Sequence, residues 1–255
     1  MQDELKKFLQ LFRFNSGLAG YIGIERERFL RSKEGLLVPA SSKFLDMIND
    51  PLWTYELSAC QVEDRTNPEK SLAKILKALR HNDRRARQIA GRLGFKLCNK
   101  EIAEENMPLD IFPDERYLKI ASRLPKEILM AACRVIGIHI HIGMKDIEHA
   151  ICAHNILREH LAELCAIGDH SSGERLELYK KMAPNWRPPH YKNPERLLQT
   201  AKAQGFRDNP RNCWHLIRIS IHGTVELRMF GSSVSNEGII SWIKLIRKML
   251  AKNSK

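Results

Sequence analysis

The sequence lacks the features that mark a secreted, membrane or zinc-knuckle protein. Its start, Met-Gln-Asp-Glu-Leu-Lys-Lys, contains acids and no long apolar segment follows it, so neither a signal peptide nor a transmembrane helix is predicted. No two cysteines have the Cys-x-x-Cys spacing of a zinc knuckle or a redox dithiol. The six scattered cysteines are Cys60, Cys98, Cys133, Cys152, Cys165 and Cys213. We expect small core residues in a reducing environment, and the predicted location is cytoplasmic.

Acidic residues and aromatic residues are also relatively few. Asp and Glu number 30 against 42 Lys and Arg, which gives a formal net charge of +12, and aromatic residues make up 7 % of the chain. A basic surface suits anionic partners such as nucleotide phosphates, nucleic acid or an acidic substrate. With 43 % apolar residues, a length of 255 residues and no internal repeat, the sequence predicts one globular domain over residues 1–255.

The stretch from Tyr21 to Phe29 contains two acids, Glu25 and Glu27, separated by one residue. In a strand these side chains project from the same face, about 7 Å apart. Two carboxylates at this separation repel and raise each other's pKa unless a cation or a basic partner lies between them. We therefore predict that both are metal ligands.

Three later segments contain similar polar pairs. The pairs are Glu56 with Glu63, His139 with His141, and Glu226 with Arg228. The histidines alternate with isoleucines, so one face of that strand is apolar and the other is polar. Glu56 and Glu63 are seven residues apart, and a regular strand would place them on opposite faces. Both can reach one site only if the segment 53–63 bulges or turns.

Periodicity predicts the remaining elements. Helices are expected over residues 3–14, 42–49, 68–93, 113–124, 145–167, 173–182, 194–204 and 237–251. Strands are expected at 36–38, 95–98, within 130–144, and at 214–220 and 224–230, with a loop over 184–194 as a candidate lid or substrate loop. Together they predict an α+β fold: an antiparallel sheet whose apolar face packs on helices, while its other face forms the active-site cavity.

Several carboxylates facing one cavity require cations. Carboxylate oxygen with occasional imidazole suits Mg²⁺ or Mn²⁺ better than zinc. Sites of this kind bridge nucleotide phosphates, and Arg228 would complete the phosphate clamp.

Two other functional classes compete with this interpretation. One is a metal-dependent hydrolase built on His139 and His141, although His149, His154 and His160 follow at spacings of five and six rather than the four that would face one metal. The other is a basic module that binds RNA or an acidic partner through the helix 68–93. That helix has basic residues on one face, but no aromatic residues alternate with them, so a solvated helix face is the favoured interpretation.

The motifs resemble those of the glutamate-cysteine ligase and carboxylate-amine ligase family. Gly23-Ile-Glu-Arg-Glu27 resembles its opening Gly-x-Glu-x-Glu strand, and Glu56 to Glu63 its second acidic strand. Gly137-Ile-His-Ile-His-Ile-Gly143 is similar to its histidine strand, and Thr224-Val-Glu-Leu-Arg-Met-Phe230 to its late Thr-x-Glu-x-Arg strand, which related amidoligases share. The order of the motifs is also that of the family. The chain is shorter than typical members, mainly between the histidine strand and the final hairpin.

The resemblance implies a glutamine-synthetase-like catalytic fold that binds ATP and two or three Mg²⁺ ions. It implies that a carboxylate is phosphorylated and the acyl phosphate is attacked by an amine, both being small molecules. By position, the implied metal ligands are Glu25, Glu27, Glu56, Glu63, Glu226 and His139, with His141 beside it. Arg228 would contact the nucleotide phosphates, Arg175 is a candidate for phosphate or substrate binding, and Glu27 and Arg228 are the expected catalytic residues.

Overall fold

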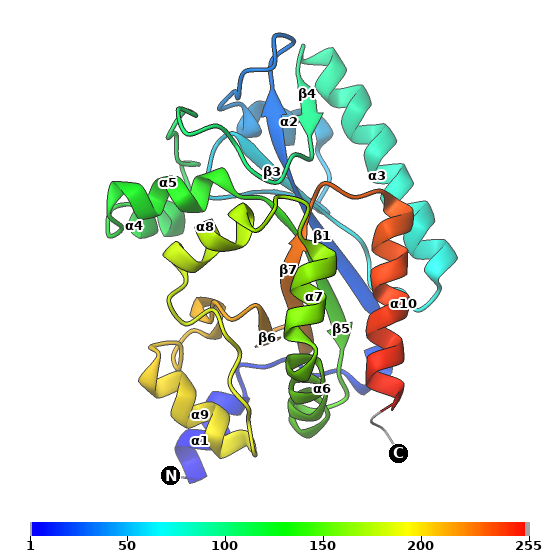
Figure 1. Cartoon of the computed structure of the whole chain (residues 1–255), viewed down its shortest axis with the longest axis vertical. Coiled ribbons are helices and arrows are strands. Elements are labelled where there is room, and N and C mark those ends of the chain that lie inside the picture. Colours follow the sequence, from blue (N-terminus) through cyan, green and yellow to red (C-terminus); the bar gives the residue numbers. More distant parts are fainter. Residues whose placement is uncertain (1, 253–255) are drawn as a thin grey trace.

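A computed structural model describes residues 2–252, and its centre is one sheet (Figure 1). The strands are β1 (Ile22–Arg31), β2 (Trp53–Tyr55), β3 (Gln61–Arg65), β4 (Lys96–Cys98), β5 (Gly137–Gly143), β6 (Ile217–Ser220) and β7 (Thr224–Gly231). They lie in the order β2-β3-β1-β5-β7-β6, β4 pairs with the last residues of β1, and these pairings are antiparallel. The predicted α+β fold with an antiparallel sheet is confirmed.

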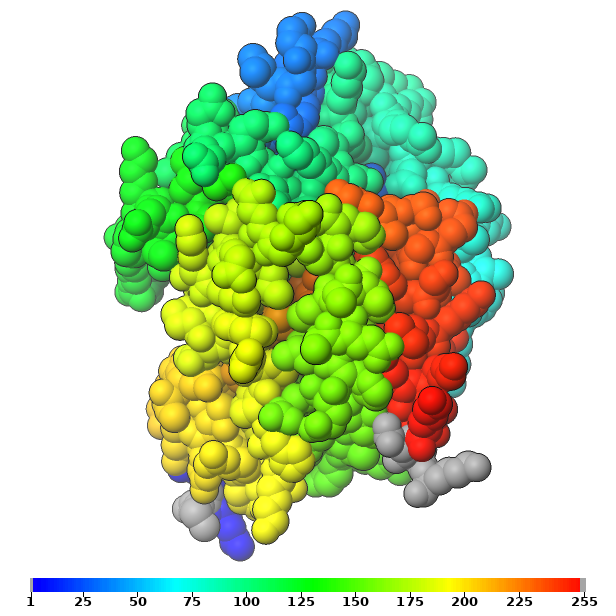
Figure 2. Space-filling view, in the orientation of Figure 1, coloured from blue at the N-terminus to red at the C-terminus, as the bar shows by residue number. Residues whose placement is uncertain are grey.

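Helices cover one face of this sheet. They are α3 (Leu72–Arg92), α6 (Ile147–Glu159), α7 (Leu161–Gly168) and α10 (Asn236–Lys252). Figure 2 shows α10 in red packed beside α6 and α7 in green on the face toward the viewer. Their apolar stripes meet strand residues such as Ile24, Ile140 and Leu227 in the largest core cluster. Because side chains alternate along a strand, burial of these residues points their neighbours toward the opposite face.

The opposite face is bordered by shorter elements. Its walls come from α4 (Glu115–Ala121), α5 (Lys126–Arg134), α8 (Glu174–Met182) and the 3₁₀ helix η2 (Pro210–Asn212). The remaining elements are α1 (Gln2–Leu9), which packs on α9 (Pro194–Ala203), α2 (Ser41–Ile48), which packs on α3, and the 3₁₀ helix η1 (Ser16–Leu18). This arrangement leaves a cavity over the middle of the sheet. Within residues 2–252, no helix has the length and apolar character needed to cross a membrane.

Two predicted strand segments differ from the strands in the structure. A turn divides the segment 53–63 into β2 and β3. This is the turn that was required for Glu56 and Glu63 to reach one site. The predicted strand at 36–38 was wrong, because it amounts to one isolated bridge between Arg31 and Leu37.

Two helix boundaries also differ from the predicted ones. The first part of the segment 130–144 belongs to α5, and the strand starts only at Gly137. The helix predicted over 145–167 is two helices, because the chain leaves helical geometry at His160, with ψ at 11°. Beyond the break α7 packs on β7, whereas α6 packs mainly on β6.

The helix-covered face of β1 is less apolar than predicted. Arg26 and Arg28 point to this face and both donate to Asp64, at 2.7 Å and 2.9 Å. Asp83 of α3 accepts a further bond from Arg28 at 2.5 Å. Two cations and two anions thus balance each other where β1 meets α3, so these charges can be buried.

Candidate functional site

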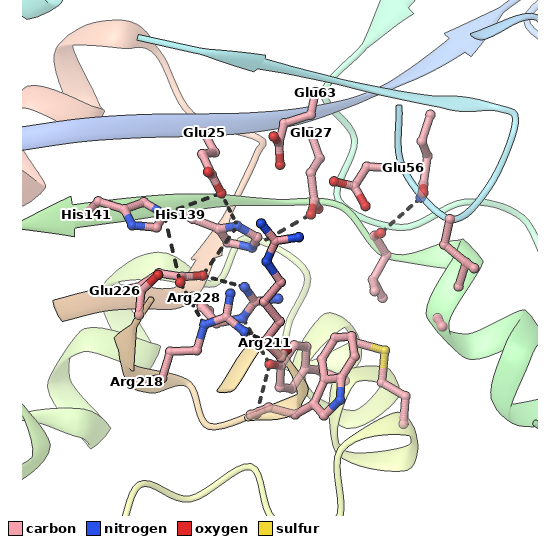
Figure 3. Close-up of a pocket in the computed structure, with 18 of the residues that line it drawn as sticks. Glu25, Glu27, Glu56, Glu63, His139, His141, Arg211, Arg218, Glu226 and Arg228 are labelled. Atoms are coloured by element: carbon pink, nitrogen blue, oxygen red, sulfur yellow. Dashed lines mark hydrogen bonds and ion pairs between the residues drawn. The ribbon is translucent and has the colours of Figure 1, made fainter. Parts of the chain in front are cut away.

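The pairing of the strands brings the predicted polar residues to one floor. Glu25 lies opposite His139, and Glu27 lies opposite Glu63. On the other side of β5, His141 lies opposite Glu226. Figure 3 shows these side chains pointing toward a common space, together with Glu56 from the turn between β2 and β3. The structure therefore brings together all seven residues predicted as metal ligands.

The floor contains three overlapping groups of potential metal ligands. They are Glu25 with His141 and Glu226, Glu25 with Glu63 and His139, and Glu27 with Glu56 and Glu63. Within each group, one ligand atom from each residue lies within 4.8 Å of the others. Carboxylate oxygens dominate the groups, and each of the first two adds one imidazole nitrogen. This donor set fits Mg²⁺ or Mn²⁺.

The environment of His141 fits a ligand role. Its Nδ1 lies 2.9 Å from the hydroxyl of Thr224, which fixes the orientation of the ring. Its Nε2 is buried, lies 3.4 Å from a carboxylate oxygen of Glu25, and has no hydrogen-bond partner among the described residues. A buried nitrogen without a partner is unfavourable unless something else binds it. A cation between Glu25 and Glu226 would do so, with Thr224 as the outer hydrogen-bond partner.

Burial raises the pKa of three of the acids, Glu27, Glu56 and Glu63. Burial is the main reason why the pKa of Glu56 rises to about 7, and the carboxylate of Glu27 adds to the effect. Burial, followed by the carboxylates of Glu25 and Glu56, also raises the pKa of Glu63 well above its ordinary value. A divalent cation between these oxygens would replace repulsion with attraction, as predicted for Glu25 and Glu27.

Two arginines hold Glu226 at the other end of the floor. Arg218 Nε donates to Glu226 Oε2 at 2.7 Å, and Arg228 Nη1 donates to Oε1 at 2.5 Å. Burial alone would raise the pKa of Glu226, but Arg218, His141 and Arg228 outweigh burial and hold that pKa far below its usual range. Arg228 also donates to the hydroxyl of Tyr179 at 3.3 Å. Glu226 is therefore an ionised carboxylate of fixed orientation.

Arg175 lines the cavity, but its contacts are with the backbone. The pairing of β5 with β7 shifts register between Ile138 and Ile140, with one extra residue on β7. Arg175 donates to the carbonyls of Arg228 at 3.3 Å and Met229 at 3.1 Å beside this bulge, and to that of Ile136 at 2.7 Å. The guanidinium thus satisfies the carbonyls at the bulge and fixes the part of β7 from which Arg228 projects.

A model of the glutamate-cysteine ligase family 2 matches residues 21–171, more than half of the chain. The match includes the strand with Glu25 and Glu27, both acids of the β2–β3 segment, and the histidine strand. The chain belongs to this family.

Individual relatives of this family-2 chain are distant. One relative is a protein of Rhodococcus jostii named "Putative glutamate--cysteine ligase 2-1", which is 24 % identical over 228 residues. The match covers 82 % of this chain and 61 % of that protein. A protein of Rubrobacter xylanophilus with the same name is 24 % identical over 270 residues, which cover 94 % of this chain and 69 % of that protein. The chain thus spans only part of the length of these relatives.

Two solved structures share the fold. A bifunctional glutathione synthetase from Pasteurella multocida has a TM-score of 0.59 at 12 % identity, covering 98 % of this chain and 40 % of that one. A structure of GmaS without ligand has a TM-score of 0.51 at 14 % identity, covering 98 % of this chain and 57 % of that one. These likenesses concern the fold alone, and the predicted glutamine-synthetase-like fold is confirmed.

The main cavity of this family-2 chain has a volume of about 300 Å³, and several of its residues were not predicted. The additional polar and aromatic residues are Gln61, Arg65, Arg116, Tyr117, Tyr179, Arg211, Trp214, Arg218, Ser220 and His222. Only Arg218 had a sequence signal, because it precedes the hairpin turn at the position that pairs with Glu226. The loop 184–194, predicted as a lid or substrate loop, contributes no residue to this lining.

A second cavity of about 380 Å³ adjoins the first near the start of β1. Both are lined by Glu25, Arg65, His141 and His222. The second also has apolar walls, which include Leu18, Tyr21, Ile24 and Pro68. The ligand groups therefore lie where two cavities meet, so two ligands could approach them from different sides.

The other histidines weighed for the hydrolase interpretation have partners outside the ligand floor. His149 contacts Asp146 and His160 contacts Glu163, while His154 is fully buried, with Nε2 3.2 Å from the carbonyl of Ile217. These histidines thus form no common metal site.

Part of the basic face of α3 is also neutralised. Lys74 pairs with Glu69 and Arg80 pairs with Glu237. Arg85 pairs with Asp50. This favours a solvated helix face over a nucleic-acid site.

Proposed function

We propose that this protein is an ATP- and Mg²⁺-dependent carboxylate-amine ligase. The observation that supports this proposal most strongly is the row of three ligand groups that ends at the arginine pair on Glu226. Membership of glutamate-cysteine ligase family 2 agrees with an amide-forming reaction. The substrates are proposed to be small molecules, with an amino acid or peptide as the carboxylate.

The metal ions would be held by the predicted acids and imidazoles of the three groups. Mg²⁺ or Mn²⁺ bound there would supply positive charge against the triphosphate. Arg228 is oriented by Glu226 and Tyr179, so its position is set before any ligand arrives. Arg211 points into the same space in Figure 3, and none of the described ion pairs involves it. Its charge is therefore available to a phosphate or carboxylate.

The proposed reaction has two steps. One oxygen of the substrate carboxylate attacks the γ-phosphorus of ATP, and ADP leaves. The amine nitrogen then attacks the carbonyl carbon of the acyl phosphate, so that phosphate departs with the former carboxylate oxygen, an amide forms and a proton is released. The arginines at Glu226 would stabilise the charge on the phosphoryl group during transfer.

The first test is ADP release in the presence of Mg²⁺ with a panel of carboxylates and amines. We expect release to require one member of each class and to fall at least about 100-fold in Glu27→Gln, because this variant removes a charged ligand from the floor. Glu237→Gln, which changes an exposed acid on α10, is the matched control and should retain activity. Calorimetry with Mg²⁺ and a non-hydrolysable ATP analogue measures nucleotide binding separately.

An isotope experiment tests the acyl phosphate. If the carboxylate substrate is labelled with ¹⁸O, one labelled oxygen should appear in the released phosphate. Phosphate without label would contradict the proposed intermediate. Failure of the protein to bind nucleotide with either Mg²⁺ or Mn²⁺ would contradict the whole proposal.

A further inference from the structure

The acids of the main cavity are all engaged once divalent cations are bound. The acids that line it are Glu25, Glu27, Glu56, Glu63 and Glu226, and each belongs to one of the three ligand groups. Six arginines line the same cavity: Arg65, Arg116, Arg175, Arg211, Arg218 and Arg228. They outnumber the acids before any cation binds, and each divalent ion adds two positive charges. The loaded cavity is therefore positive and favours anionic or neutral ligand groups.

Two of these arginines, Arg116 and Arg211, carry charges without an acidic partner. None of the ion pairs found within residues 2–252 involves either of them, and the Arg116 guanidinium lies 5.4 Å from the centre of the Tyr117 ring. Arg116 also lies one helical turn before Ile120, which lines the same cavity. An ammonium group of a ligand at this end would meet a cation rather than an acid.

The end of the cavity near Arg116 also differs in polarity from the ligand floor. Under α4 and α5 the lining is apolar, from Leu57, Ile120, Ala132 and Val135. A triphosphate and its metal ions gain nothing from such a wall, because they need charged or polar partners. The wall therefore suits an apolar part of another ligand.

This apolar wall is attached firmly to the rest of the site. Tyr55 stacks on Phe112 with ring centres 4.0 Å apart, and its hydroxyl donates to Asp114 at 2.9 Å. Asp114 caps the first turn of α4. From the same helix, the hydroxyl of Tyr117 lies 3.4 Å from Glu56 Oε2. The wall is thus held next to a ligand group of the floor.

Gln61 supplies one fixed hydrogen-bond acceptor beside the wall. Its amide nitrogen donates to the carbonyls of Cys133 and Val135 at 2.9 Å and 3.1 Å. The side chain is buried and lines the cavity, and none of the described residues donates to its Oε1. One neutral acceptor matches the single N–H of an amide. It does not match an ammonium group, which has several donors and a charge to satisfy.

We propose that the carboxylate substrate is an N-acylated amino acid with an apolar side chain, such as the last residue of a peptide. Its carboxylate would face the ligand floor, its side chain would contact Leu57, Ile120 and Val135, and its amide N–H would donate to Gln61. In a free amino acid the amide is replaced by an ammonium group, which would lie among arginines without an acid.

The positive cavity does not oppose the second substrate, because an amine attacks in its uncharged form and nearby cations favour that form. The inference rests on the proposed function, since it chooses between the two kinds of carboxylate proposed for that reaction.

The test measures binding to protein loaded with Mg²⁺ and the non-hydrolysable ATP analogue. Affinities are read as displacement of radiolabelled N-acetyl-L-leucine, so a ligand that binds only in the place of the amine does not count. The competitors are L-leucine, which has the ammonium group, and N-acetylglycine, which lacks the apolar side chain. We expect unlabelled N-acetyl-L-leucine to bind at least about 10-fold more tightly than either, because it alone leaves no charge unpaired and covers the wall.

A further competitor, Gly-Gly-L-leucine, distinguishes the two sources of the acyl group. Its ammonium group lies two residues away from the leucine. It should bind as tightly as N-acetyl-L-leucine if the natural substrate is a peptide, and more weakly if the acyl group is a small one.

Substitution of Arg116 tests the charge argument directly. Arg116→Glu removes a cation and adds an acid near the apolar wall, so L-leucine should gain at least about 10-fold relative to N-acetyl-L-leucine. Arg123→Glu makes the same change of charge at an exposed arginine that does not line the cavity, and this matched control should leave the ratio unchanged.

Three results would overturn the inference: no binding of N-acetyl-L-leucine to the loaded protein, equal displacement by L-leucine or N-acetylglycine, or an unchanged ratio in Arg116→Glu. Loss of nucleotide binding would instead overturn the proposed function.

Discussion

Replacement of Asp64 should strongly destabilise the fold without touching the cavity. Its side chain is fully buried behind β1, where it accepts hydrogen bonds from Arg26, Arg28 and Asn82 at 2.7 to 2.9 Å. Asp64→Ala would leave two buried guanidinium groups with Asp83 as their one acidic partner among residues 2–252. An unpaired buried charge is far more unfavourable than the loss of the ion pair itself.

The expected loss for Asp64→Ala is about 3–5 kcal/mol in the free energy of unfolding, the range observed when one partner of a buried ion pair is removed. The exposed pair of Glu237 with Arg80 is the control, because both side chains are more than half exposed, at 59 % and 57 %. Glu237→Ala should change stability by less than about 1 kcal/mol. Since whole domains are stable by about 5–15 kcal/mol, the first variant should be close to unfolding and the second should not.

Urea unfolding followed by circular dichroism measures both variants. We expect a lower midpoint for Asp64→Ala with an unchanged slope, because the surface exposed on unfolding stays the same. The pKa of Asp64 is lowered because Arg26 and Arg28 outweigh its burial, so the folded state binds fewer protons and stability falls as the pH drops below about 4. Asp64→Asn should flatten that decline. A destabilisation of less than about 1 kcal/mol in Asp64→Ala would refute this account.

Two other predictions concern residues outside the ligand floor. Gly137→Ala should destabilise the protein by about 1–3 kcal/mol, because the new methyl group would collide with Arg175 and lie 2.9 Å from the carbonyl oxygen of Phe230. Gly91→Ala, in an open position of α3, should instead stabilise the protein by about 0.5–1 kcal/mol in the same urea assay. Burial lowers the pKa of His215 to about 4, so the folded state holds it neutral and stability should fall by up to about 1.4 kcal/mol per pH unit between about pH 6.5 and 4. His215→Gln should reduce that slope, and an equal slope in both proteins would contradict the assignment.

The sequence predicts the sheet and its two faces because both depend on a local pattern. In β5 isoleucine alternates with histidine, and in β1 the isoleucines Ile22 and Ile24 occupy alternate positions to the acids Glu25 and Glu27. This alternation determines the face of each side chain without knowledge of the partners. The order of strands and the break at His160 were not predictable in this way, since they depend on packing between distant segments. The buried charges at Arg26 and Arg28 had no local signal either, because their partners Asp64 and Asp83 come from β3 and α3.

In the candidate site, too, the residues placed by a local pattern were predicted and those placed by tertiary contacts were not. The seven predicted ligands lie on strands or next to one, and the antiparallel register brings them together. The sequence showed only that the chain must turn or bulge between Glu56 and Glu63 if both are to reach one site; it did not predict the turn itself. Arg116 and Tyr117 face the cavity because Phe112 and Asp114 anchor α4, a tertiary contact without a signal in the sequence. The contacts of Arg175 with the carbonyls at the bulge of β7 were likewise not predictable, because the bulge exists only in the pairing with β5.

The two faces of β1 depend on each other. A slip of this strand by one residue would turn Arg26 and Arg28 into the cavity and bury Glu25 and Glu27 against α3. Apolar residues oppose this slip only in the first part of the strand, where Ile22 and Ile24 are buried in the core under the helices; farther along, Phe29 and Leu30 are both fully buried, one on each face. The arginines add to this preference, since only the observed register pairs them with Asp64 and Asp83 while the acids meet His139 and Glu63. The charges behind the sheet therefore help to specify which face of β1 becomes the ligand floor, and Asp64 contributes to the site without being part of it.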